Sequence, residues 1–100
     1  MSFHDVLNSL YRKATTATEH EKEDVLAATR AILIDLAAKG VDRISKEALK
    51  HNVMYHDETG EVRSSAFENA FFHAISDLKD EGLKFEVRTA SHTKIFYFWS

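Results

Sequence analysis

The first ten residues carry an amphipathic helical pattern. Their apolar members fall three and four residues apart and share one side of a helix: Phe3, Val6, Leu7 and Leu10. Ser2 and Asp5 have the spacing of a capping box, which favours a helix start. Small and β-branched residues at 14–17 interrupt the pattern. We therefore predict a short first helix that ends near residue 14.

A longer helical pattern follows the interruption. Thr18 and Glu21 form a second, stronger capping-box pair. Apolar residues from Val25 to Leu36 then keep to one side until Gly40, and glycine commonly follows the last turn of a helix. The pattern predicts a helix over residues 18–40.

The middle of the chain is less regular. Residues 41–44 alternate as a short strand does, and Ser45 can cap a short helix that runs to Lys50. Turn-forming residues at 57–60 are flanked by segments that could pair, so residues 54–63 form either a small hairpin or a plain loop.

A fourth helix is expected over residues 65–82. Ser65 and Glu68 have capping-box spacing, and Gly82 provides the stop. Phe67 and Phe71 lie on its apolar face, whereas Phe72 falls roughly 115° from the centre of that face. We expect Phe72 at the rim of the core, packed by the hairpin or the first helix, with contact to a partner as the alternative.

The pattern changes to a period of two after Gly82. Apolar and charged residues alternate over 83–88, which is typical of a half-buried strand, and residues 89–93 turn the chain. The return strand at 94–99 is apolar on both faces, so one face needs a cover. Either the first helix or a second subunit would supply it.

Composition fits one globular domain. A chain of 100 residues can bury one core, and its 44% hydrophobic residues leave no segment that resembles disorder. The absence of cysteine excludes disulfides and suits a reducing compartment. No secretory signal pattern and no run of about 18 apolar residues is present. We expect a cytoplasmic location.

This order of elements resembles the winged helix-turn-helix family. The resemblance rests on residues 44–49, which are similar to the family's strand and second helix, and on residues 71–87, which are similar to its recognition helix and wing. It implies an α+β, winged-helix-like fold, with three to four helices packed on a C-terminal antiparallel β-hairpin. Residues 18–100 would form this domain, with residues 1–17 as an N-terminal helical extension of one globular unit.

The resemblance also implies binding to double-stranded DNA. The start of the fourth helix and the hairpin carry side chains suited to phosphates or base edges. The candidate DNA contacts are Arg63, Ser64, Ser65, Asn69, Arg88, His92 and Lys94. The same residues are also consistent with ordinary surface charges and helix caps.

Charge favours a different partner. The chain has a net charge of −3, and residues 64–82 hold four carboxylates against one lysine. Acidic helices repel the DNA backbone, which supplies much of the binding energy. The apolar surplus at Phe72, Phe96 and Phe98 instead favours contact with another protein or with a second copy of the chain.

No residue pattern indicates an enzyme, a metal site or a cofactor. Six histidines are scattered without recognised ligand spacing, and three glycines leave no phosphate-binding loop. We expect a non-enzymatic binding module with no metal, cofactor, membrane or small-molecule partner. It would be a transcriptional regulator or a phage- or plasmid-type accessory protein; the alternative is an inhibitor, adaptor or homodimerising protein that does not bind DNA.

Overall fold

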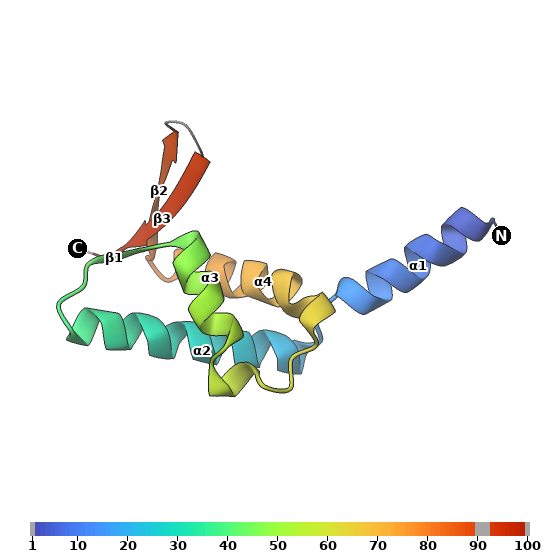
Figure 1. Ribbon diagram of the computed structural model, residues 1–100, viewed down its shortest axis with the longest axis horizontal. Helices are drawn as coiled ribbons and strands as arrows, with labels where there is room; N and C mark the ends of the chain where they lie inside the picture. The colour runs from blue at the N-terminus through green and yellow to red at the C-terminus, as the bar shows by residue number, and fades with distance from the viewer. Residues whose placement is uncertain (1, 90–92, 100) are drawn as a thin grey trace.

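The computed structural model describes residues 2–89 and 93–99 (Figure 1). Its elements are α1 (Phe3–Thr15), α2 (Glu19–Ala38), β1 (Arg43–Ser45), α3 (Lys46–Met54), the 3₁₀ turns η1 (Asp57–Thr59) and η2 (Ser64–Ala66), α4 (Phe67–Asp80), β2 (Lys84–Thr89) and β3 (Thr93–Phe98). The predicted α+β, winged-helix-like arrangement is confirmed. In the described part of the chain, no helix is long and apolar enough to cross a membrane.

The sheet has three antiparallel strands in the order β1-β3-β2. The predicted hairpin is present, with Phe85 of β2 opposite Tyr97 of β3. The short strand begins two residues later and ends one residue later than predicted. It pairs with the free edge of β3, so that Ile44 also lies opposite Tyr97. The Trp99 indole N–H donates a hydrogen bond to the Val41 carbonyl at 2.9 Å, which links the residue after β3 to the segment before β1. The third strand of the sheet is therefore supplied by the chain itself.

The core lies between α2, α3, α4 and the inner face of the sheet. Val25, Leu49 and Val53 are fully buried, and Phe71 and Tyr97 close the core from α4 and β3. Alternation along β3 turns Tyr97 inward and its neighbours outward. The predicted core face of α4 is confirmed, because Phe67 and Phe71 are both buried.

Helix boundaries follow local hydrogen bonds. Ser2, Thr18 and Ser45 cap α1, α2 and α3 as predicted, because each hydroxyl accepts a backbone N–H of the first turn. Gly40 and Gly82 take positive φ values of 83° and 107° after α2 and α4, a region that favours glycine. The predicted cap at Ser65 is wrong, since α4 begins at Phe67 after η2 and has no side-chain cap.

Residues 55–63 form a loop rather than a hairpin. The loop contains η1, and the buried Thr59 hydroxyl lies 2.8 Å from the carbonyls of both Val53 and His56. Thr59 thus ties the loop back to the end of α3. Of the two alternatives left open by the sequence, the loop is correct.

Helix α1 extends away from the rest of the molecule (Figure 1). None of its residues is buried. The radius of gyration is 15.5 Å, against about 13 Å for a compact domain of this length. The expectation that α1 covers the hairpin is therefore wrong.

Candidate functional site

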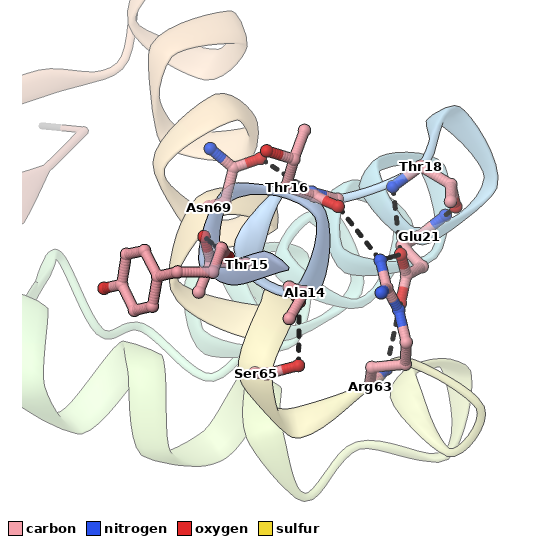
Figure 2. A network of polar contacts seen from close by, with 10 residues as sticks. Ala14, Thr15, Thr16, Thr18, Glu21, Arg63, Ser65 and Asn69 are labelled. Atoms are coloured by element: carbon pink, nitrogen blue, oxygen red, sulfur yellow. Dashed lines mark hydrogen bonds and ion pairs between the residues drawn. The ribbon is translucent and has the colours of Figure 1, made fainter. Parts of the chain in front are cut away.

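The start of α4 is attached to the segment that joins α1 to α2. Arg63, Ser65 and Asn69 all bond to the backbone of residues 14–17, as Figure 2 shows. The contacts join Ser65 Oγ to the Ala14 carbonyl (2.8 Å), Arg63 Nη2 to the Thr16 carbonyl (2.9 Å) and the Ala17 amide to Asn69 Oδ1 (2.9 Å). We call Arg63, Ser65, Asn69 and Glu21 the clamp.

Glu21 is the buried centre of the clamp. Its carboxylate accepts from the Thr18 amide at 2.9 Å, and from the Arg63 backbone and side chain at 2.8–3.0 Å (Figure 2). The hydrogen bonds from the Arg63 guanidinium, followed by that from Thr18, hold the pKa of Glu21 far below its usual range. The hydrogen bonds that the Arg63 guanidinium donates to Glu21 also raise the pKa of Arg63. The clamp thus fixes residues 14–18 against α4.

Three of the predicted DNA contacts therefore have structural partners. Arg63, Ser65 and Asn69 use polar groups to hold the α1–α2 connection, and nothing in their local sequence indicates this. Ser64 is exposed beside them in η2. DNA contact by these four residues stays a prediction.

The outer face of the hairpin holds both predicted DNA contacts, Arg88 and Lys94, and predicted protein contacts, Phe96 and Phe98. Register places Lys94 opposite Arg88, Phe96 opposite Glu86 and Phe98 opposite Lys84, on the side away from buried Tyr97. The Arg88 guanidinium lies 5.0 Å from the Phe96 ring centre and Lys84 Nζ lies 5.8 Å from that of Phe98. Cations thus partly cover the apolar surplus of β3. His92, the remaining predicted contact, lies outside the described residues.

The opposite side of the hairpin faces a groove beside α4. The groove has a volume of about 340 Å³, and Phe72, Ile75, Ile95 and Tyr97 supply much of its apolar lining. Phe72 is 69% exposed, so the prediction that the hairpin or the first helix packs against it is wrong. This groove combines an aromatic floor with an open side.

Lysines surround the groove. Lys46 and Lys79 line it, Lys94 and Lys46 line an adjoining hollow, and Lys50 pairs with Glu68 at the rim. Lys84, Arg88 and Lys94 lie on the outer side of the hairpin. We call the basic residues around α4 and on both sides of the hairpin the cationic face: Lys46, Lys50, Lys79, Lys84, Arg88 and Lys94. Three carboxylates interrupt it, from Glu47, Glu68 and Glu86.

Charge is therefore unevenly distributed. The cationic face holds six basic and three acidic residues, whereas the rest of the chain holds seven basic and thirteen acidic residues. Glu81 pairs with Arg30 of α2, and at about 100° per residue Asp77 falls on the opposite side of α4 from the groove. Two of the carboxylates that argued against DNA binding by α4, those of Asp77 and Glu81, thus lie away from the cationic face.

Histidines of the middle segment have structural contacts. The His51 ring packs on Tyr55 with ring centres 4.9 Å apart, and His56 Nδ1 accepts the Glu58 amide at 3.1 Å. Over residues 2–89 and 93–99, no three histidine, aspartate or glutamate side chains gather in a group that could hold a metal ion.

No family model, curated protein or solved structure matches the chain.

Proposed function

We propose that this chain is a non-enzymatic module that binds double-stranded DNA through its cationic face. The observation that carries the proposal is the concentration of basic side chains around α4 and the hairpin of an otherwise acidic molecule. Contacts to phosphates supply most of the sequence-independent affinity for DNA, and a local basic surface can provide them. A small regulator or a phage- or plasmid-type accessory protein would use such a module.

The elements of this face suit different parts of a duplex. The exposed side of α4 presents Phe72 and Ser76 between Lys46 and Lys79. An apolar ring can contact a thymine methyl group, and a hydroxyl can bond to several base edges. Arg88 and Lys94 lie opposite each other on the hairpin, where they would contact phosphates. In this arrangement α4 reads bases and the hairpin fixes the position of the protein.

Charge reversal on the hairpin tests the proposal. Arg88→Glu with Lys94→Glu should weaken binding to a labelled random 20-base-pair duplex at least tenfold, because two phosphate contacts become repulsive. Fluorescence anisotropy at low salt measures the affinity. Lys22→Glu with Lys39→Glu is the matched control, since it makes the same charge change on α2 and at the residue that follows it.

The control variant shows whether DNA binding depends on the position of the charges or only on net charge. If both double variants weaken binding equally, only net charge matters and the cationic face is not the DNA site. If neither variant changes a measurable affinity, the proposal is also wrong. Circular dichroism on both variants checks that their folds match the parent.

A second function is favoured by the groove itself. Phe72 of α4 is 69% exposed. Phe85 and Val87, on the same side of the hairpin as Tyr97, are 52% and 50% exposed. Apolar surface of this extent is typical of protein-binding sites. A protein partner would therefore insert an apolar segment between α4 and β3.

Phe72→Ser separates the two functions. Under the DNA proposal the substitution removes a contact at the centre of the cationic face and lowers duplex affinity severalfold. Under the protein-binding alternative the duplex affinity stays unchanged or is absent from the start. The fold should be unaffected in both cases, because Phe72 packs little in the monomer.

A further inference from the structure

Helix α1 exposes an apolar stripe that no other part of the described chain covers. Phe3 is 76% exposed, Leu7 is 49% exposed and Leu10 is 59% exposed. A helix of 13 residues is at the lower limit of stability in water without tertiary packing. The stripe therefore indicates that α1 packs against something outside its own chain.

The clamp keeps α1 from folding back onto its own domain. Hydrogen bonds from Ser65 and Arg63 hold the last turn of α1 and the residue after it, and Asn69 holds Ala17. Because three bonds fix this base, the rest of α1 points into solvent (Figure 1). A second molecule can approach α1 as far as its last turn, which contacts η2 and α4, without meeting the body of the first.

We propose that α1 pairs with α1 of a second copy in an antiparallel arrangement, with the twofold axis between Asn8 and Ser9. The stripe reads almost the same in both directions about that point. Leu7 then faces Leu10 of the other copy, and Phe3 faces Ala14, so that a large residue meets a small one at each end.

Charge placement is compatible with this pairing. Asp5 and Arg12 are seven residues apart and share the side of α1 that is opposite the stripe. Neither is buried by the contact, and no like charges are brought face to face. Antiparallel packing also aligns the two helix dipoles favourably.

The area that two α1 helices can bury limits the affinity of the homodimer. Two helices of about 20 Å bury less than the roughly 800 Å² per partner of a standard stable interface. The homodimer should therefore be weak, with a dissociation constant in the micromolar range. The inference does not depend on DNA binding, so either proposal can fail without the other.

Light scattering after size exclusion tests the self-association. The wild-type chain should shift from monomer to dimer between about 1 and 200 µM, an affinity range typical of small interfaces. Leu7→Asp should remain monomeric with an unchanged melting temperature, because α1 contributes no buried residue to the domain. Ile34→Asp is the control, since Ile34 is equally apolar and exposed on α2. A monomeric wild type at 200 µM would overturn the proposal.

Disulfide trapping tests the direction of the helices. The chain has no cysteine, so introduced thiols report on their own positions. A mixture of Phe3→Cys and Ala14→Cys chains should form the mixed disulfide, because antiparallel pairing brings these positions together. Positions 3 and 3 of two copies would be about 16 Å apart along the axis, too far for a disulfide. Same-position disulfides in place of the mixed one would contradict the antiparallel arrangement.

Discussion

Glu21 illustrates how one side chain can serve both local and long-range structure. Its carboxylate closes the capping box of α2 with Thr18, and it also receives Arg63 from 42 residues away. A buried carboxylate in this position depends on remaining ionised. Stability of the domain should therefore respond to acid.

The pH dependence of stability follows from the direction in which folding changes the pKa of Glu21. The pKa of Glu21 is lower in the folded chain than in the unfolded chain, so its contribution is complete above about pH 5. That contribution is lost as the pH falls, because protonation favours the unfolded state. Glu21→Gln should lower the melting temperature at pH 7 by about 5–10 °C and reduce the further loss between pH 5 and 3.

Thermal unfolding at pH 7, 5 and 3 measures this effect. Glu23→Gln is the matched control, because Glu23 is an exposed carboxylate in the same turn. If the Glu21 and Glu23 variants give the same three melting temperatures, the clamp does not stabilise the domain through this carboxylate.

Sequence reasoning identified local partners at the residue scale and missed distant ones. The Thr18–Glu21 capping box was predicted because its two residues are three apart, and the structure confirms it. The bonds that Ser65 and Asn69 make to residues 14–17 span about fifty positions, and no local pattern marks them. Both residues therefore looked like free helix-start groups.

At the scale of elements, the period-two pattern predicted β2 and β3 correctly. It did not predict that β1 completes the sheet, since pairing between segments fifty residues apart leaves no local signal. It also did not predict the direction of α1. An amphipathic stripe shows that a helix has an apolar side and does not identify what covers that side.

The sheet should depend on the inward side chain of β3. Tyr97 is buried against both β1 and β2 partners, so Tyr97→Ala should destabilise the domain by about 3 kcal/mol. Phe85→Ala, at the paired position of β2, should cost less than about 1 kcal/mol because the Phe85 ring is half exposed. Urea unfolding followed by tryptophan fluorescence measures both. Equal losses would contradict the difference in burial between these two rings, which share one face of the hairpin.

At the scale of the whole molecule, net charge is a poor guide to binding. The value of −3 combines an acidic body with a face on which basic residues outnumber acidic ones two to one. The charges of residues 64–82, counted along the sequence, predict a helix that repels DNA. In the structure Lys79 lines the groove, whereas Asp77 lies on the other side of α4 and Glu81 is paired with Arg30. Such separation depends on three-dimensional arrangement, which composition does not contain.

The most direct test of DNA binding is the salt dependence of duplex affinity. If about five side chains of the cationic face contact phosphates, the logarithm of the association constant should fall with the logarithm of salt concentration at a slope of about −4.5. Fluorescence anisotropy between 50 and 200 mM salt gives this slope, and Arg88→Glu with Lys94→Glu should reduce its magnitude by about two. Absence of binding at 50 mM salt, or a slope near zero, would contradict the proposal that this face binds DNA.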